Sequence, residues 1–93
     1  MPMKRRYTRS EGITERQVDD VIFLVNPEND ALYHLNPVGA ALWRLLENQI
    51  SGEEAAELIC LAFPDADATT VKMDIVKLLA EFSDHGLITF VKS

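Results

Sequence analysis

This sequence has little of what secreted, membrane-spanning and disulfide-rich proteins are built from. Its single cysteine, Cys60, cannot form a disulfide within the chain, and a lone thiol is typical of a reducing compartment. No apolar run approaches the roughly 18 residues that a membrane span requires. The basic residues 1–6 are not followed by an apolar segment like that of a secretory signal. We therefore expect a soluble, cytoplasmic protein that makes no contact with a membrane.

Side chains suited to metal binding or catalysis are also scarce. Cys60, His34 and His85 share no short ligand spacing, so no metal site is predicted. His34 falls in a predicted strand and His85 in the last turn of a predicted helix, where each has a structural explanation. Asp19 and Asp20 are adjacent in a predicted turn, where carboxylates are ordinarily solvated. We expect neither an enzyme nor a bound cofactor.

Composition and charge fit one small globular domain with an acidic body. The 93 residues are 47% hydrophobic and 26% charged, with a formal net charge of -6 at pH 7. Residues 1–16 hold five basic and two acidic side chains, which leaves a charge of -9 on the rest of the chain. Because such a body repels phosphate, we do not expect nucleic-acid binding. We expect residues 13–93 to form the domain and residues 1–12 a basic, flexible arm, with contact to an anionic partner as the alternative for the arm.

Three strands are predicted in the first part of the chain. Residues 21–25 form a β-branched and aromatic run, and residues 13–18 alternate weakly before a turn at Asp19 and Asp20. Residues 27–30 have the Pro, Asn and Asp chemistry of a tight reversal, and residues 31–35 follow at strand length. The second and third strands are therefore predicted to form a hairpin.

Helices are predicted to follow the strands. Asn36 is suited to cap a helix that begins at Pro37, because its side-chain oxygen reaches free amides of the first turn and proline at that position loses no useful donor. Ser51 and Glu54 have the spacing of a capping box. The second helix that they begin must end before Pro64, which lacks the amide proton and restricts the residue before it.

The third helix has the strongest periodic signal. Its apolar residues recur along one face at Val71, Ile75, Leu78, Leu79 and Phe82. Gly86 can adopt the left-handed conformation that ends a helix, and residues 87–91 then form a short strand or an apolar tail. Strands followed by helices predict an α+β fold.

The segments that carry these elements resemble the PqqD family. The similarity covers residues 13–91 and lies in the segments 21–25, 32–36, 38–46, 51–63 and 71–88. Within them, the third strand ends with Tyr33, Leu35 and Asn36, Gly39 follows three residues later, and Asp74 lies inside the last helix. The resemblance implies a three-stranded antiparallel β-sheet followed by a three-helix, winged-helix-like bundle.

The resemblance also implies a function. PqqD-like proteins are small, non-catalytic chaperones that hold the leader of a ribosomally made precursor peptide and present it to a modifying enzyme. In pyrroloquinoline quinone (PQQ) synthesis that enzyme is a radical S-adenosylmethionine (SAM) protein, and the iron–sulfur cofactor belongs to it. Residues 47–51 depart from an Asp-Gly and Arg-Thr pairing typical of members dedicated to PQQ, so a different peptide pathway stays open.

An edge strand beside a groove would explain such binding. Edge strands have unpaired amides and carbonyls that an extended peptide satisfies by adding as another strand, and its alternate side chains enter the groove. By analogy with the family, the predicted peptide-binding residues are Leu32, Tyr33, His34 and Leu35 on the strand wall and Val71, Asp74, Ile75, Leu78 and Phe82 on the helix wall. Several of them must be core residues instead. The exposed charges expected to select the partner sequence are Lys72, Asp74, Lys77 and Glu81.

Two other functions fit the same predicted elements. A winged-helix regulator would bind DNA through the third helix, but Lys72 and Lys77 are offset there by Asp74 and Glu81, so the helix lacks a basic bias. A dimeric adaptor would pair its bare sheet edges with a second copy. The sequence favours peptide recognition and leaves a homodimer open.

Overall fold

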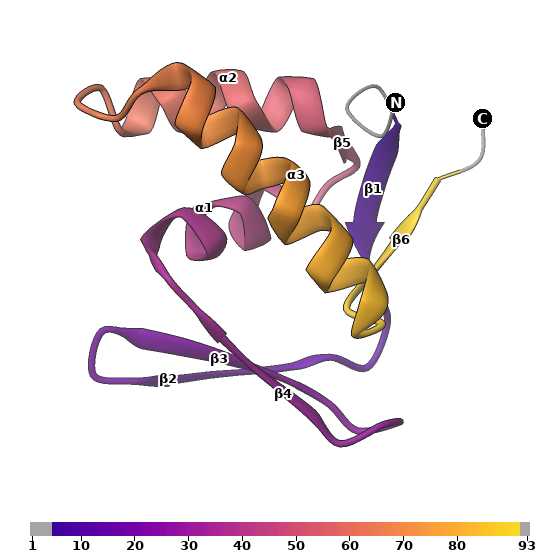
Figure 1. Cartoon of the computed structure of the whole chain (residues 1–93). Helices are drawn as coiled ribbons and strands as arrows, with labels where there is room; N and C mark the ends of the chain where they lie inside the picture. The colour runs from indigo at the N-terminus through magenta and orange to yellow at the C-terminus, as the bar shows by residue number, and fades with distance from the viewer. Residues whose placement is uncertain (1–4, 92–93) are drawn as a thin grey trace.

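Two three-stranded antiparallel sheets and three helices form the molecule, and the computed structural model describes residues 5–91 except for the side chain of Ala31 (Figure 1). In chain order the elements are β1 (Arg6–Arg9), β2 (Thr14–Val18), β3 (Val21–Asn26), β4 (Ala31–Leu35), α1 (Pro37–Leu45), β5 (Ile50–Ser51), α2 (Gly52–Ala62), α3 (Ala68–Asp84) and β6 (Ile88–Phe90). This arrangement confirms the predicted α+β class. None of the helices in the described residues is long and apolar enough to cross a membrane.

The larger sheet has the strand order β2-β3-β4, which confirms the three predicted strands. Its register places Ile22 opposite Leu35 and Leu24 opposite Tyr33. Side chains alternate along β3, so Ile22, Leu24 and Asn26 are buried while the residues between them are half-buried. The sheet therefore has one face toward the core and one face away from it.

The smaller sheet, with the order β5-β1-β6, includes a segment that the sequence analysis assigned to a flexible arm. That prediction is wrong for Arg6–Arg9, which form β1 between two partners, with Tyr7 opposite both Ile50 and Phe90. The physical reason is that the side chain of Tyr7 is only 6% exposed and joins the core. Residues 1–4 of the predicted arm lie outside the described residues.

Arg9 shows how a basic strand is accommodated. Its guanidinium donates from Nε and Nη2 to the carbonyl oxygen of Trp43, at 3.0 and 2.7 Å, and lies over the Trp43 ring at 4.4 Å from its centroid. Arg6 forms an ion pair with Glu54 at 2.7 Å. The charges that suggested an arm therefore bind α1 and α2.

The predicted helix caps are confirmed. Asn36 Oδ1 accepts from the amide of Gly39 at 2.7 Å, and Ser51 and Glu54 form the reciprocal capping box. The backbone amide of Ser51 and the nearby Arg6 both favour the Glu54 carboxylate and lower its pKa. Asp67 caps α3, and Gly86 ends it with a φ of +70°.

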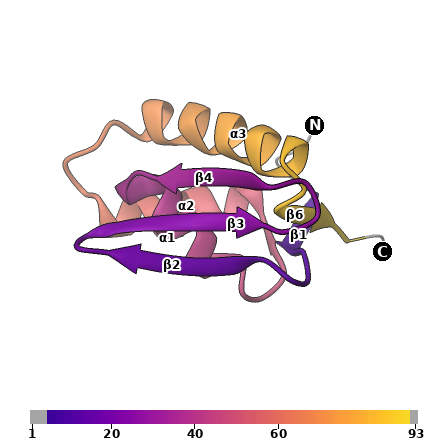
Figure 2. The same cartoon turned by 90° about the horizontal axis from the view of Figure 1, so that it is seen from below.

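The core lies between the β2–β3–β4 sheet and the helices, which cover only one face of that sheet (Figure 2). Its largest fully buried side chains are Trp43, Phe82, Leu24, Leu42, Leu46, Ile59, Ile75, Leu87 and Val71. Burial of these apolar groups is the main stabilising contribution to the fold. It also holds α3 alongside β4, at one edge of the sheet (Figure 2).

Candidate functional site

The edge of β4 is open. The sheet order β2-β3-β4 makes β4 an outer strand, and β3 is its pairing partner. Among the described residues, no backbone hydrogen bond joins residues 32–35 to any element other than β3. Outward-facing amides and carbonyls of β4 are therefore available to another extended chain.

A groove separates this edge from α3. A cavity of about 140 Å³ is lined by Tyr33 and Asn36 on the strand side, and on the α3 side by Asp74, Lys77, Leu78 and Glu81. The α3 residues recur at intervals of three and four, so they lie on one face of the helix. The groove thus has an open backbone ladder on one side and a mixed-charge helix face on the other.

Tyr33 joins the two walls. Its hydroxyl donates a hydrogen bond to the Glu81 carboxylate, and its ring packs against Phe82 and His85, each with a centroid distance of 5.4 Å. Burial, the hydrogen bond to Glu81 and the negative charge of Glu81 raise the pKa of Tyr33 from 10.0 to about 12. The hydroxyl therefore stays protonated and donating at physiological pH.

Asn26 holds the end of α3 against the sheet. Its side chain is only 4% exposed, and Nδ2 donates to the carbonyls of His85 at 3.0 Å and Gly86 at 3.4 Å. A Cβ on Gly86 would lie 2.9 Å from Asn26 Nδ2, so the contact requires glycine there. This buried link sets how closely α3 approaches β4, because Asn26 is the last residue of β3.

The predicted site residues fall into three groups. Tyr33, Asp74 and Leu78 are brought together in the groove, as expected. Leu32 and His34 lie on the strand face that points away from the helices, where Leu32 is 66% exposed and His34 packs against Phe23. The remaining four do not line the groove.

The prediction that these four side chains line the groove is wrong. They are buried in the core: Leu35, Val71, Ile75 and Phe82. Their apolar stripe faces the sheet and the other helices because burial of that stripe is what attaches α3 to the domain. They support the groove from behind, as Phe82 does through its contact with Tyr33.

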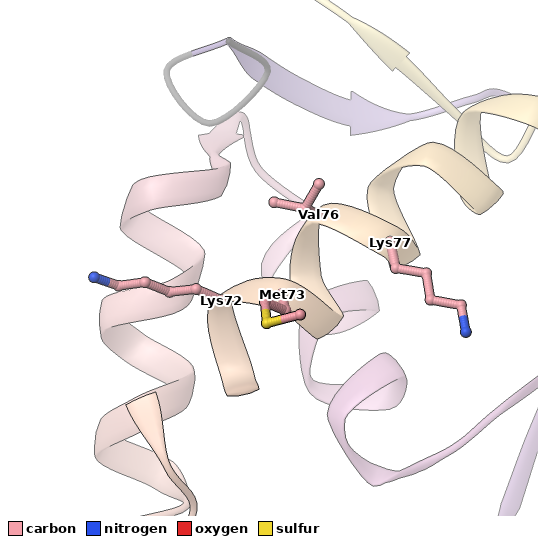
Figure 3. Close-up of a pocket in the computed structure, with 4 residues that line it drawn as sticks. All are labelled: Lys72, Met73, Val76 and Lys77. Atoms are coloured by element: carbon pink, nitrogen blue, oxygen red, sulfur yellow. The ribbon is translucent and has the colours of Figure 1, made fainter. Parts of the chain in front are cut away.

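Sequence reasoning missed Asn36 and two apolar residues of α3. Met73, which is 67% exposed, and Val76 line a shallow cavity of about 430 Å³ together with Lys72 and Lys77. Figure 3 shows Met73 and Val76 between the two lysines, whose amines extend in opposite directions. Lys77 also lines the groove, so this apolar surface adjoins it. One signal in the sequence could have identified this surface: Met73 is apolar although it lies outside the periodic stripe of α3, so it was to be expected on the exposed side of the helix.

Among residues 5–91, no three His, Cys, Asp or Glu side chains gather where they could hold a metal ion. The groove offers hydrogen-bonding, charged and apolar surfaces along an open strand. Together these features define a small α+β domain organised around an edge strand and a flanking helix.

A family comparison agrees with this class. The family model described as Coenzyme PQQ synthesis protein D (PqqD) matches residues 22–88, and the chain belongs to the PqqD family. The resemblance inferred from the sequence is thereby confirmed. Among curated protein sequences, none matches this chain at a significant level.

Solved structures share the fold. The chain is similar to a protein described as TbiB1 in complex with the TbiA(beta) leader peptide, with 24% identity and a TM-score of 0.76 over 92% of this chain and 99% of the other. A lasso peptide synthetase B1 complexed with the leader peptide has 18% identity and a TM-score of 0.74, and the match covers 89% of this chain and 96% of the other. The third structure is the PqqD truncation of Methylobacterium extorquens PqqCD, described as a stand-alone recognition element for ribosomally synthesized and post-translationally modified peptides. It has 19% sequence identity and a TM-score of 0.72, and the match covers 90% of this chain and 88% of the other.

Proposed function

We propose that this chain is a non-catalytic recognition domain that binds the leader of a ribosomally made precursor peptide as an added strand on β4. The observation that carries the proposal is the open β4 edge beside the α3 groove. Membership of the PqqD family supports it. So does the fold shared with two proteins that are described as complexes with leader peptides.

Backbone pairing would supply sequence-independent affinity. An extended leader next to β4 exchanges hydrogen bonds with alternate residues of that strand, and each such bond contributes about 1 kcal/mol net. Its side chains alternate, so every second one enters the groove between Tyr33 and α3. Specificity then depends on which side chains suit that groove.

The groove favours leader side chains that are basic or apolar. Asp74 and Glu81 place two carboxylates against one amine, Lys77. A basic side chain entering the groove complements the carboxylates, whereas an apolar one reaches Leu78, or Met73 where the surface continues over α3. Leu32, Tyr33 and His34 would contact the added strand from β4.

Presentation to an enzyme would follow from binding. A held leader keeps the rest of the precursor peptide close to the domain, which raises its effective concentration at a modifying enzyme that binds the same domain. We propose a radical SAM protein or another peptide-modifying enzyme for this role, with any iron–sulfur cofactor belonging to that partner. The departure at residues 47–51 keeps pathways other than PQQ synthesis in view.

A titration tests the proposal. Isotope-labelled protein is titrated with the leader of the precursor peptide encoded beside this chain's gene, and amide shifts are followed by NMR. We expect shifts in β4 and on the groove face of α3 at residues 74–81. Absence of shifts up to about 1 mM peptide, weaker than any physiologically useful leader affinity, would contradict the proposal. Shifts confined to β2 would also contradict it, because they would place the peptide on the other edge of the sheet.

A further inference from the structure

The outward side of α3 carries an apolar surface beyond the groove. Met73, which is 67% exposed, and the half-buried Val76 line a shallow cavity of about 430 Å³ together with Lys72 and Lys77 (Figure 3). These four residues are called the outer α3 surface. Methionine has a flexible, polarizable side chain that adapts to different apolar partners, and it is frequent on binding surfaces. The outer α3 surface is therefore suited to receive an apolar side chain.

This surface is continuous with the groove at one end. Figure 2 shows that α3 runs antiparallel to β4, so the start of α3 lies toward the end of β4. Asn36, Asp74 and Lys77 line the groove at that end, whereas Tyr33 contacts Glu81 nearer the other end. Lys77 lines both the groove and the outer α3 surface. A chain that leaves the groove past Asn36 therefore has the outer α3 surface directly beside its path.

The outer α3 surface has one positive charge that the helix does not offset. Neither Lys72 nor Lys77 has an ion-pair partner within residues 5–91. Lys77 has carboxylates three and four residues away on α3, at Asp74 and Glu81, which offset its charge. No carboxylate occupies a position three or four residues from Lys72. Lys72 is therefore the amine of this surface that is available to a carboxylate of a bound chain.

The size of the outer α3 surface favours a short stretch of extended chain. Residues 72–77 extend roughly 8 Å along the helix axis, which equals two or three residues of an extended peptide. A stable complex between folded proteins buries roughly 800 Å² on each partner, far more than two apolar side chains supply. A weak contact becomes useful when the same chain is already held elsewhere, because its effective concentration is then high. The leader held at β4 meets this condition.

We infer that the outer α3 surface binds the flank of the leader that leaves the groove at the Asn36 end. The inference rests on the proposed function and specifies the leader sequence that it requires. An apolar side chain of the flank contacts Met73 and Val76, and a carboxylate within about three residues of it pairs with Lys72. The groove itself favours basic or apolar side chains. A leader for this domain therefore combines a strand-forming segment with an apolar and acidic flank.

Methyl NMR tests where the flank lies. The full chain is labelled with ¹³C in its methionine methyl groups, and the Met73 signal is identified by its loss in Met73→Leu. The probes are the full leader encoded beside this chain's gene and a peptide trimmed to the segment that pairs with β4. We expect both peptides to shift the β4 amides, and only the full leader to shift the Met73 methyl signal.

The outcomes separate the inference from the proposed function. If the full leader shifts the β4 amides and leaves the Met73 signal unchanged, the inference is overturned and the proposed function stands. An equal Met73 shift with the trimmed peptide would also overturn the inference, because the contact would not come from the flank. Absence of β4 shifts with both peptides would refute the proposed function itself. A Met73 signal that responds only to the modifying enzyme, or only to protein concentration, would assign the surface to that enzyme or to a second copy and overturn the inference.

Charge reversal tests the acidic part of the flank. Lys72→Glu is compared with the matched control Arg16→Glu, which makes the same change of charge at an exposed position on β2. Because an attraction becomes a repulsion, we expect Lys72→Glu to weaken binding of the full leader by about fivefold at low salt and by less at high salt. Affinity for the trimmed peptide should stay within about 1.5-fold in both variants, because neither side chain lines the groove.

The leader supplies the reciprocal change. Replacing the carboxylate of the flank by lysine should weaken binding to wild type and restore binding to Lys72→Glu, which a merely structural role of Lys72 would not do. Equal losses in Lys72→Glu and Arg16→Glu would overturn the inference, as would an equal loss for the full and trimmed peptides. A leader that binds at β4 but has no carboxylate in either flank would overturn it as well.

Discussion

The two edges of the larger sheet differ in what lies beside them. Both β2 and β4 are outer strands of the same sheet, so each has one side of its backbone free of strand partners. All five residues of β2 are exposed, whereas β4 faces α3 across a groove (Figure 2). Edge strands are common in proteins, and it is the flanking helix with its side chains that distinguishes a binding edge from a merely exposed one.

Side-chain chemistry further separates the edges. β2 carries Glu15 and Arg16 at its centre, and charges on an edge strand discourage pairing with another chain. Glu15 also accepts a hydrogen bond from Trp43 Nε1 at 2.8 Å, which ties β2 to α1. In β4 the corresponding hydrogen bond, from Tyr33 to Glu81, points across the groove. We therefore expect disturbances of the β4 side to affect leader binding and those of the β2 side to have little effect.

The largest expected effect comes from removing the link that holds α3 near β4. Asn26→Ala removes a buried side chain that donates to the carbonyls of His85 and Gly86 and accepts from the Glu28 amide, and it leaves a void. We expect the free energy of unfolding to fall by about 3 kcal/mol, since lost buried hydrogen bonds cost the desolvation of the partners left unpaired. Urea denaturation measures the stability, and leader titration of the folded fraction measures the binding.

A nearby asparagine provides the control for this variant. Asn29 Nδ2 also donates to the His85 carbonyl, at 3.3 Å, but Asn29 is exposed, so water can replace it. We expect Asn29→Ala to cost less than about 1 kcal/mol. If both variants lose the same stability, burial of Asn26 does not anchor α3.

The second prediction concerns the backbone ladder of β4. The test peptide is a leader with N-methyl groups on two alternate residues whose amides face β4. Each methyl group removes one hydrogen bond to β4 and clashes with that strand. We therefore expect about thirtyfold weaker binding, or about 2 kcal/mol. The same two methyl groups moved by one residue point away from β4 and serve as the control, with affinity within about twofold. Fluorescence anisotropy measures both peptides. If the two registers weaken binding equally, the peptide does not bind as an added strand.

Local sequence signals predicted most of the fold because each acts over a few residues. The Ser51 and Glu54 spacing, the Asn36 cap and the stripe from Val71 to Phe82 all function within one or two helical turns, and the structure contains each of them. The Asp19 turn is likewise local, with a φ of +55° that aspartate tolerates. Periodicity and capping are therefore sufficient for the three helices and the larger sheet.

What the sequence could not reveal depends on contacts between distant residues. β1 pairs with β5 and β6, and its one buried side chain, Tyr7, is surrounded in the sequence by basic residues. Trp43 is only 2% exposed, and its polar atoms bind the distant residues Arg9 and Glu15. No local pattern predicts such partners.

The same limit applies to the candidate site. The apolar stripe of α3 identified the helix correctly, but an apolar position in a stripe is either core or groove, and only the packing decides between them. Ile75 and Phe82 are fully buried, whereas Leu78 lies in the same stripe and still reaches the groove. The charges flanking the stripe, Lys77 and Glu81, were a better guide because charged side chains remain near the surface.

The third prediction isolates the hydrogen bond across the groove. Tyr33→Phe removes the donor to Glu81, and we expect a loss of about 1 kcal/mol at pH 7. Because the folded-state pKa of Tyr33 is raised from 10.0 to about 12, its stabilising contribution is complete below pH 10 and is lost as the pH rises through about 12. The stability difference between wild type and Tyr33→Phe should therefore shrink over that range, as measured by denaturation at several pH values.

Glu81→Gln checks the cause of this pH dependence. Removing the negative charge takes away the coulombic cause of the raised Tyr33 pKa, while the amide oxygen still accepts from the hydroxyl, so the loss of stability should be complete at a lower pH than in wild type. An unchanged profile in Glu81→Gln would show that the negative charge of Glu81 does not contribute to the raised Tyr33 pKa. Leader affinity measured on the same variants shows whether the hydrogen bond from Tyr33 to Glu81 preorganises the groove for binding.

The smallest expected effect compares the two edges directly in one cross-strand row. Thr14 and Leu32 both lie opposite Val25, one on β2 and the other on β4, and both side chains are exposed. A leader strand next to β4 would gain one cross-strand apolar contact with Leu32, which is worth about 0.7 kcal/mol or threefold in affinity. We therefore expect Leu32→Lys to weaken leader binding by about threefold and Thr14→Lys to change it by less than about 1.5-fold, as measured by isothermal titration calorimetry. An equal loss in the two variants would mean that charge anywhere on this face repels the leader, and a larger loss in Thr14→Lys would mean that the peptide adds to β2.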